Sequence, residues 1–464
     1  MLDIRARRPA FLLPAMALAV ALLGLLSHEM SPDGWYALLG GDLIVHHGLP
    51  SHDWLTVWGH GRRWVDQQWL AQLAFYGLYA FGGLRLALLV NALVVVASFS
   101  GALVAARARG AGESALLLVA IPAAAAVGLS SYALRPQTLA LPLFVALLSL
   151  LVDDSRRPSL RVFLVLPLLV VWANIHGSVT LGVLLVLLAV ACASWRERKV
   201  RPRNAGLAVA SIAAALASPY GVHLLGYYHA ILFNGQFAQY VPDWMPTTLG
   251  PTTLAFYVLA FLTLFAIGRH PTSLTLFERV TLVLLLLLSI QAIRGITWFS
   301  FASVIIVPSA LRPVWTVAAC AAAPAFAAAA VALLGTAAVA LIQPGHRFES
   351  GYPASIAAAT RAAAGSNAKV FANGAYSDWL LLREPALRGR VAYDARFEVL
   401  PRGRLADASS VSIDRWDTSR ILAPFDVVVL RPEETELRAA LLRTGRWQAV
   451  ASRADVAVLR RARA

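Results

Sequence analysis

The sequence predicts a bundle of membrane-spanning helices followed by a small α/β domain, and three observations lead to this fold class. Of the 464 residues, 59% are hydrophobic and only 14% are charged, whereas soluble chains average about half and about a quarter. Apolar runs recur as far as residue 343, and from there short apolar and polar stretches alternate. This composition excludes a soluble enzyme, a disordered tail and a small disulfide-stabilised scaffold.

About eleven apolar segments make up the predicted all-α polytopic membrane domain, residues 1–343. They cover residues 9–27, 84–106, 114–133, 137–152, 162–173, 179–194, 205–217, 252–268, 280–293, 298–309 and 315–342. The apolar run at 281–308 is divided at Arg294 and Gly295, because a charged side chain and a glycine are unfavourable inside a lipid-facing helix.

Basic residues are distributed unequally between the two sets of connecting loops. Sixteen lie in alternate connections, at Arg5, Arg7, Arg8, Arg107, Arg109, Arg156, Arg157, Arg161, Arg196, Arg198, Lys199, Arg201, Arg203, Arg269, Arg279 and Arg312. The opposite connections hold five, at Arg62, Arg63, Arg85, Arg135 and Arg294. The positive-inside rule makes the first set cytoplasmic, which predicts a cytoplasmic N-terminus and an extracytoplasmic C-terminal domain. Because loop arginines account for much of the net charge of +15, no nucleic-acid partner is expected.

Residues 344–464 predict a soluble α/β domain outside the membrane. Strands are expected at 369–373, 390–394 and 425–430, helices at 377–383 and 432–444, and two short strands within 447–460. Asp378, Asp394 and Arg396 are the notable polar residues of this domain. Asp394 ends an expected strand and is interpreted as a turn residue.

A long external loop, residues 28–68, follows the first predicted span and carries Asp33 near its beginning. A carboxylate at the membrane–water boundary suits a general base for a hydroxyl group or a ligand of a divalent metal ion. The same residues also fit the start of a helix, with Ser31 as N-cap, Pro32 in the first position and Asp33 in the first turn. Both interpretations stay open at this stage.

Further polar residues interrupt the apolar runs on the same predicted side of the membrane. The candidate binding residues among them are Arg135, Asn174, His176, Tyr220, Asp243 and Arg294. Polar and charged side chains at membrane depth are costly, and they mark either a site or a buried pairing. Since the loop charges place all of them on one face, we expect them to gather around one external site.

Each of these residues has an alternative role. The guanidinium groups of Arg135 and Arg294 suit a lipid-linked phosphate, but long basic side chains also snorkel to the membrane interface. Asn174 and His176 are alternatively hydrogen-bond partners between helices. Tyr220 lies in a Ser-Pro-Tyr-Gly sequence that is typical of a turn ending a helix.

Several of these motifs together resemble a known family. They are DGWY at 33–36, HHGLP at 46–50, WVDQQWL at 64–70, RPQ at 135–137, WANIHG at 172–177, SPYG at 218–221, YSDWL at 376–380 and VAYDAR at 391–396. The chain is similar over nearly its whole length to bacterial GT-C-type membrane glycosyltransferases, the group related to polyprenyl-phosphate-mannose mannosyltransferases.

The resemblance implies a GT-C-like enzyme of the bacterial plasma membrane, a hexosyltransferase that uses a polyprenyl-phosphate sugar donor at the external leaflet. Asp33 matches the family's first-loop acid, which serves as base or metal ligand. Position 31 is Ser rather than an acid, and Tyr36-Ala37 replaces an aromatic-His pair, so the need for a divalent metal ion is left open. The implied partners are a lipid-linked sugar donor and membrane lipids, and the sequence does not specify the acceptor.

In the implied mechanism, Arg135 or Arg294 neutralises the phosphate leaving group while Asp33 takes the proton of the acceptor hydroxyl. Two other functions are compatible with the sequence. A non-catalytic scaffold with the same fold is favoured by the missing first acid and histidine. A transporter or flippase of lipid-linked sugars predicts two related halves with broken helices, and no such internal symmetry is evident in the sequence.

Overall fold

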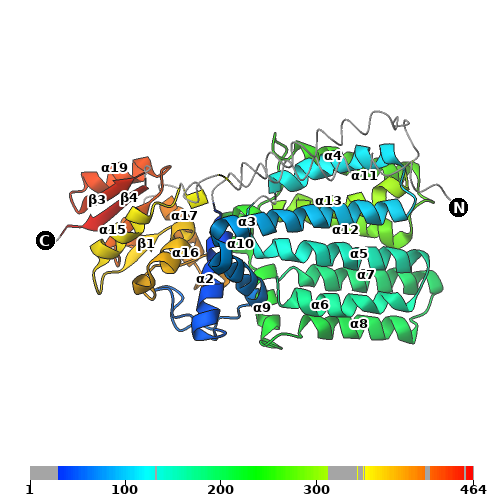
Figure 1. The fold of residues 1–464 in the computed structure, drawn as a ribbon, viewed down its shortest axis with the longest axis horizontal. Helices are drawn as coiled ribbons and strands as arrows, with labels where there is room; N and C mark the ends of the chain where they lie inside the picture. Colours follow the sequence, from blue (N-terminus) through cyan, green and yellow to red (C-terminus); the bar gives the residue numbers. More distant parts are fainter. Residues whose placement is uncertain are drawn as a thin grey trace.

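The computed structural model describes residues 30–130, 133–311, 342, 348–349, 351–412, 418–453 and 456–462. The predicted spans at 9–27 and 315–342 lie outside these residues, except for Ile342. Within the described ranges the chain is mostly helical and has one small sheet near its C-terminal end (Figure 1).

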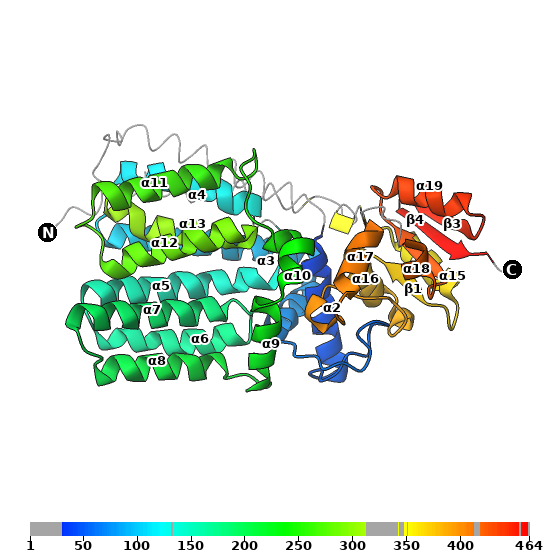
Figure 2. The same cartoon turned by 180° about the vertical axis from the view of Figure 1, so that it is seen from behind.

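Nine helices of the described chain lie side by side in one bundle (Figures 1 and 2). They are α3 (Trp69–Ala108), α4 (Glu113–Ser130), α5 (Leu141–Arg156), α6 (Val165–Ala173), α7 (Val179–Glu197), α8 (Pro202–Ala215), α11 (Leu254–Arg269), α12 (Leu276–Gln291) and α13 (Ile296–Ile306). Within the ranges that the structure describes, three segments are long and apolar enough to cross a membrane by themselves: Trp69–Ala108, Pro136–Arg156 and Val179–Glu197. The count of about eleven spans therefore stays a prediction.

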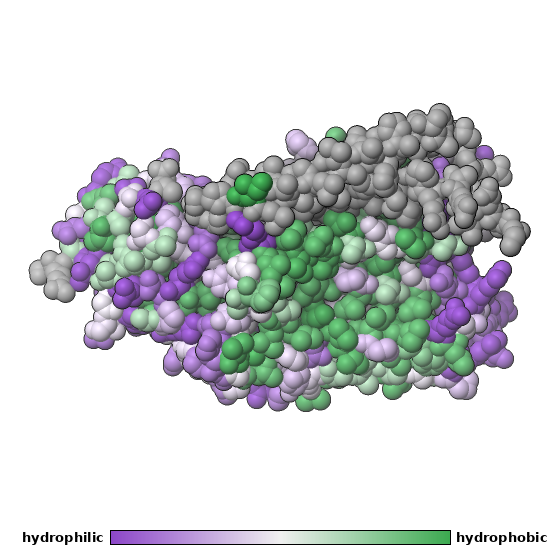
Figure 3. All heavy atoms as spheres, in the orientation of Figure 1, coloured by the Kyte–Doolittle hydropathy of each residue, from purple (hydrophilic) through white to green (hydrophobic). Residues whose placement is uncertain are grey.

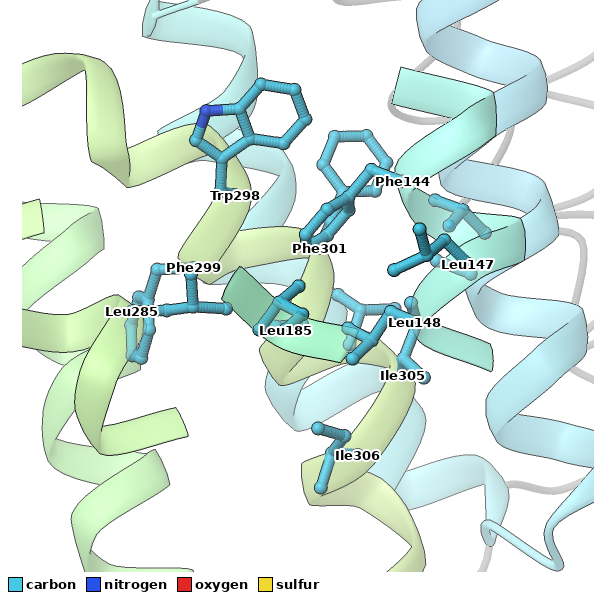
Figure 4. Close-up of a cluster of buried hydrophobic side chains, with 14 of the residues drawn as sticks. Phe144, Leu147, Leu148, Leu185, Leu285, Trp298, Phe299, Phe301, Ile305 and Ile306 are labelled. Atoms are coloured by element: carbon cyan, nitrogen blue, oxygen red, sulfur yellow. The ribbon is translucent and has the colours of Figure 1, made fainter. Parts of the chain in front are cut away.

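The interior of the bundle is built from large apolar side chains of α5, α7, α12 and α13 (Figure 4). Phe144 and Trp298 lie with their ring centroids 5.0 Å apart, and Phe299 meets Phe256 of α11 at 5.7 Å. Many apolar side chains on the outside of the helices remain exposed, and Figure 3 shows them as a broad hydrophobic surface along the bundle. Such a surface suits helices that lie against lipid.

The break between α12 and α13 confirms the division that the sequence predicted at Arg294 and Gly295. Ala292 has an extended backbone, and the 3₁₀ turn η4 (Ile293–Gly295) then reverses the chain. Gly295 is required there, because a Cβ atom would lie 2.7 Å from the Cα of Ser289. The two helices consequently pack against each other as a hairpin.

The basic connections between helices meet at the end of the bundle away from the sheet. There Arg109 lies 2.8 Å from Asp153, Arg156 lies 2.7 Å from Glu278, and Arg203 lies 2.5 Å from Asp154. The connections after α3, α5, α7 and α11 therefore share one end, as the arginine distribution predicted. The polar candidate residues lie at the opposite end.

Short helices cover that opposite end and connect the bundle to the C-terminal domain. They are α2 (Pro32–His47), α9 (His223–Leu232), α10 (Gly235–Tyr240) and η3 (Pro242–Trp244). Figures 1 and 2 show α2 and α9 running across the axes of the bundle helices. Glycines 82 and 83 bend α3, and α2 packs on α3 and on the C-terminal domain.

The C-terminal domain contains a four-stranded sheet in the order β1-β2-β4-β3. β1 (Val370–Ala372) runs parallel to β2 (Val427–Leu430), whereas β4 (Val456–Arg461) is antiparallel to both β2 and β3 (Trp447–Arg453). The described helices around it are α15 (Ala354–Ala364), α16 (Gly374–Arg383), α17 (Arg404–Ser412), α18 (Thr418–Leu422) and α19 (Thr435–Arg443). The short 3₁₀ turns η7 (Pro385–Leu387) and η8 (Phe397–Val399) lie between α16 and α17.

The strand predicted at 390–394 is wrong. Only Val391 forms bridges, to Val370 of β1 on one side and to Thr56 of the first loop on the other. The N–H groups of Val57 and Trp58 donate to the carbonyls of Val391 and Ala392 at 2.8 and 3.0 Å. The first loop thus extends the edge of the sheet, and side-chain contacts with this loop determine the conformation of the segment that follows Val391.

The interpretation of Asp394 as a turn residue is confirmed, because its Oδ1 accepts a hydrogen bond from the N–H of Arg396 at 3.0 Å, the contact of an Asx turn, but the side chain also has a second role. Asp394 is buried and forms an ion pair with Arg396, whose Nη2 also lies 2.7 Å from Asp53 Oδ1 of the first loop. The guanidinium group of Arg396 stacks on Trp64 with 4.0 Å to the ring centroid. This buried cluster of Arg396, Asp53 and Asp394 fixes the first loop to the C-terminal domain.

Candidate functional site

An arginine and two aspartates from three separate segments meet at the end of the bundle that faces the sheet. Asp33 is in the first turn of α2, which begins as the sequence predicted: Ser31 is the N-cap and accepts a hydrogen bond from the N–H of Gly34, and Pro32 comes first in the helix. Arg135 precedes the 3₁₀ turn η1 (Pro136–Ala140), and Asp243 lies in η3. We call these three side chains the Arg135 cluster.

Arg135 bridges the two carboxylates. Its Nε lies 3.2 Å from Asp33 Oδ2, and its Nη1 lies 2.6 Å from Asp243 Oδ2. The side chains remain 26%, 46% and 38% exposed for Arg135, Asp33 and Asp243. Because solvent reaches all three groups, another anion can compete with the carboxylates for the guanidinium group.

Arg294 lies next to the Arg135 cluster. Its guanidinium group stacks on the ring of Trp244, 4.4 Å from the centroid, and Trp244 follows Asp243 directly in the chain. The N–H of Ile293 donates to the carbonyl of Met245 at 3.1 Å and thereby holds η4 against η3. Among the described residues no carboxylate forms an ion pair with Arg294, so its N–H groups are available to a ligand.

His176 faces this pair of arginines from the turn between α6 and α7. Burial and the positive charges of Arg294 and Arg135 lower the pKa of His176 to about 3. The backbone N–H of Ser178 donates to His176 Nδ1 at 3.1 Å, which places the remaining proton of the neutral ring on Nε2. His176 is therefore an uncharged hydrogen-bond donor at neutral pH.

Asn174 is fully engaged within the protein. Its Oδ1 accepts from Trp69 Nε1 at 2.9 Å, and its Nδ2 donates to the carbonyls of Val170 and Ala217 at 2.8 Å each. These bonds connect α3, α6 and the end of α8. Asn174 therefore has its alternative role, that of a hydrogen-bond partner between helices. We therefore do not include Asn174 in the site.

Tyr220 supports the first loop rather than the Arg135 cluster. Its hydroxyl donates to the carbonyl of Pro50 at 2.9 Å, and burial followed by the charge of Asp66 raises its pKa. The turn interpretation of Ser218 to Gly221 is confirmed, because α8 ends at Ala215 and a turn follows. Tyr220 therefore lies beside a second polar group of residues that the sequence analysis did not identify.

This second group, which we call the Tyr227 group, consists of Tyr227 on α9, Asp66 and Gln67 in the first loop, and Glu398 in η8. Gln67 Oε1 and Tyr227 Oη each lie 3.4 Å from the point where a Cβ atom of Gly177 would be. Burial raises the pKa of Tyr227, and the nearby carboxylates of Glu398 and Asp66 raise it further.

Asp66 illustrates what the sequence could not reveal. It precedes α3, and its carboxylate is buried and accepts a hydrogen bond from Gln72 Nε2 at 2.9 Å. Burial raises the pKa of Asp66 to about 7, although Arg396 partly opposes the shift. The motif around Asp66 was visible, whereas Glu398 and Tyr227 lie in no motif that the sequence analysis singled out.

The described residues do not favour a bound metal ion. Within the described ranges no group of three or more His, Cys, Asp or Glu side chains is arranged to hold one. The two carboxylates of the Arg135 cluster are bridged by a guanidinium group, which already supplies their positive counter-charge.

No protein-family model and no curated protein matches this sequence. Solved structures do match it. ArnT from Cupriavidus metallidurans in the apo state has 16% sequence identity and a TM-score of 0.55, with 97% of each chain covered. The same ArnT bound to undecaprenyl phosphate has a TM-score of 0.54 at 16% identity, again over 97% of each chain.

A second protein has the same fold. The Archaeoglobus fulgidus oligosaccharyltransferase, tethered to an acceptor peptide, gives a TM-score of 0.52 at 12% identity over 92% of this chain and 70% of its own. At these identities the comparison establishes the fold. The chain described here therefore has the GT-C-like fold of ArnT and the archaeal oligosaccharyltransferase.

Proposed function

We propose that this protein is a membrane glycosyltransferase that moves a sugar from a polyprenyl-phosphate donor to an acceptor at the external leaflet. The observation that carries the proposal is the pairing of two guanidinium groups, on Arg135 and Arg294, with the carboxylate of Asp33 at one end of a bundle whose sides are apolar. Its fold neighbour ArnT has been solved with undecaprenyl phosphate, which supports this class of donor.

The two arginines are suited to the phosphate of the donor. Guanidinium groups bind phosphate oxygens through parallel N–H bonds, and Arg294 has no competing ion pair among the described residues. Neutral His176 adds an N–H donor on the same side. Together they stabilise the negative charge that develops on the phosphate as it leaves.

The lipid chain of the donor requires an apolar surface near these arginines. α9 provides one, because Leu225, Leu232 and Phe233 on and just after this helix are 55%, 50% and 76% exposed. The same helix places Tyr227 toward the polar groups. In our proposal the polyprenyl chain lies along the apolar face of the bundle near α9, with its phosphate at Arg294.

Asp33 is the proposed general base. A hydroxyl oxygen of the acceptor attacks the anomeric carbon of the sugar while its proton passes to the Asp33 carboxylate. The bond between the anomeric carbon and the phosphate oxygen breaks, and polyprenyl phosphate leaves with the bonding electrons. Binding of the donor phosphate to Arg135 releases Asp33 from its ion pair, which frees the carboxylate for this role.

The orientation in the membrane belongs to the same proposal. The basic connections share one end of the bundle, and the candidate residues share the other. By the positive-inside rule the basic end is cytoplasmic. The Arg135 cluster and the C-terminal domain then lie outside the plasma membrane.

The proposal is tested by transfer of radiolabelled sugar from polyprenyl-phosphate donors in membranes that contain the wild-type chain or the Asp33→Asn variant. General-base catalysis contributes about 10²- to 10⁴-fold, so we expect Asp33→Asn to lower the rate at least 100-fold. The matched control is Asp153→Asn, which changes an exposed ion-paired aspartate at the opposite end.

Wild-type activity that Asp33→Asn leaves intact would remove Asp33 from the mechanism. Wild-type membranes that transfer no sugar from any lipid donor would reject the transferase proposal and favour the scaffold alternative. Movement of the lipid-linked sugar across the membrane without transfer would favour the flippase alternative.

A further inference from the structure

The C-terminal domain brings a carboxylate to the end of the bundle. Glu398 lies in η8, which packs directly against α9. Its side chain is half-buried, and within the described part of the chain it forms no ion pair. The negative charge of Glu398 raises the pKa of both Tyr227 and Asp66. The packing of η8 on α9 therefore brings Glu398 near the Tyr227 group.

Buried polar atoms without partners lie around the same place. Asp66 Oδ2 and Gln67 Oε1 are buried and accept no hydrogen bond. An unpartnered buried polar atom is unfavourable, and most buried polar side-chain atoms in native structures have a hydrogen-bond partner. Because Gly177 has no side chain, the position that its Cβ atom would occupy, 3.4 Å from both Gln67 Oε1 and Tyr227 Oη, is left empty by this residue. These observations point to a small molecule that supplies hydrogen-bond donors.

The chemistry of the Tyr227 group differs from that of the arginines. Asp66, Gln67 and Glu398 offer carboxylate and amide oxygens, which accept hydrogen bonds from hydroxyl groups but repel a phosphate. Arg135 and Arg294 have the opposite preference. One end of the bundle thus contains an anion-binding part and a hydroxyl-binding part.

We propose that Glu398 and Asp66 bind the hydroxyl groups of the acceptor, so that the C-terminal domain and the first loop together form the acceptor site of the reaction. The acceptor is then a hydroxyl-rich molecule, such as a sugar unit, rather than an anionic group. This inference rests on the proposed transferase function, but it assigns residues that the Asp33 mechanism does not use.

The test compares Glu398→Gln with wild type in the full-length protein reconstituted in lipid. Two quantities are measured: binding of undecaprenyl phosphate, and transfer of radiolabelled sugar to acceptors in a membrane extract whose amount is titrated. A hydrogen bond to a charged group contributes about 1.5–3 kcal/mol, so we expect the apparent KM for the extract to rise about 10- to 100-fold. Undecaprenyl phosphate binding should stay at the wild-type level.

Two further variants make the result decisive. Glu433→Gln changes an exposed carboxylate of the same domain, 72% exposed, and should leave both quantities unchanged. Gly177→Ala adds a methyl group at ordinary contact distance from Gln67 and Tyr227, so it should fold and should raise the KM for the extract. This variant decides the question if Glu398→Gln proves unstable in a melting experiment.

The outcomes separate the two proposals. An active wild type with Glu398→Gln and Gly177→Ala transferring normally would overturn the acceptor site and leave the transferase function standing. Equal loss of undecaprenyl phosphate binding and of transfer in Glu398→Gln would place Glu398 in the donor site and also overturn the inference. A wild type that transfers no sugar would reject the proposed function and this inference with it.

Discussion

Two clusters in this protein each join one arginine to two aspartates, and they differ in almost everything else. The Arg135 cluster joins residues of three separate segments at the end of the bundle, and solvent reaches every member. The cluster of Arg396, Asp53 and Asp394 lies between the first loop and the C-terminal domain, where Arg396 is 1% exposed in its side chain. The same combination of one arginine and two aspartates therefore occurs once in a solvent-accessible cluster and once in a buried one.

The difference shows how burial determines what an ion pair can do. An exposed pair contributes about 0–1 kcal/mol, so its members can exchange partners when a ligand arrives. A buried pair becomes strongly destabilising once one partner is removed, because the remaining charge has no compensation. We therefore assign ligand binding to the Arg135 cluster and attachment of the first loop to the Arg396 cluster.

The largest effect is expected from Arg396→Met, which leaves Asp53 and Asp394 buried without a counter-charge. We expect the free energy of unfolding to fall by about 3–5 kcal/mol, measured by denaturation of the full chain in detergent with tryptophan fluorescence. The matched control is Arg404→Met. Arg404 also stacks on a first-loop tryptophan, Trp58, and pairs with Asp407, but it is 40% exposed. Similar losses in both variants would contradict the role of burial.

The next effect concerns Asp66, a buried acid near Arg396 that forms no ion pair with it. Burial raises the pKa of Asp66 to about 7, against about 3.9 in an unfolded chain. The folded state therefore favours the protonated acid, and its stabilising contribution is complete below pH 4 and is lost as the pH rises to 7. Relative to wild type, Asp66→Asn should gain stability over this range, approaching about 4 kcal/mol at pH 8.

The experiment on Asp66 compares the free energies of unfolding of the two proteins from pH 4 to pH 8. The pKa of Glu398 is also raised to about 7 by burial, and its charge acts on Asp66, so the same comparison is repeated in a Glu398→Gln background. Parallel pH profiles would show that Asp66 does not carry a raised pKa in the fold.

A smaller effect is expected beside the solvent-accessible cluster from Arg294→Gln. This change removes a charged donor to phosphate, worth about 1.5–3 kcal/mol, so the Kd for undecaprenyl phosphate should rise about 10- to 100-fold. The unfolding transition should hardly move. Arg157→Gln, at the opposite end and exposed, is the control for general loss of positive charge. An unchanged Kd in Arg294→Gln would remove this arginine from the proposed donor site.

The two clusters also differ in how much of each could be predicted from the sequence. Charges in loops, read with the positive-inside rule, placed Asp33, Arg135, Asp243 and Arg294 on one face, and the structure brings these four side by side. The predicted membrane topology is sufficient to place these residues on one side, because each of them interrupts or borders an apolar run.

The Arg396 cluster was not predictable in the same way. Asp53 and Arg396 are separated by 343 positions, and the backbone pairing that joins them passes through the single bridge at Val391. A contact between residues so far apart in the chain cannot be predicted from the spacing of hydrophobic residues or from the sequence of a local turn. The turn at Asp394 was predictable because its backbone contact is with Arg396, two residues ahead, whereas the pairing of Arg396 with Asp53 was not.

The smallest effect on stability is expected in the solvent-accessible Arg135 cluster. Asp243→Asn removes one of the two carboxylates that hold Arg135. Because the pair is partly exposed, the free energy of unfolding should change by less than about 1 kcal/mol, whereas Asp53→Asn in the buried cluster should cost several times more. Arg135 keeps Asp33 as a partner but loses a competitor for phosphate. We therefore expect undecaprenyl phosphate to bind about two- to fivefold more tightly to Asp243→Asn at low ionic strength, and the gain to shrink as salt is added. Weaker binding in this variant would mean that Asp243 positions Arg135 for the phosphate instead of competing with it, and the exposed cluster would then be as preorganised as the buried one.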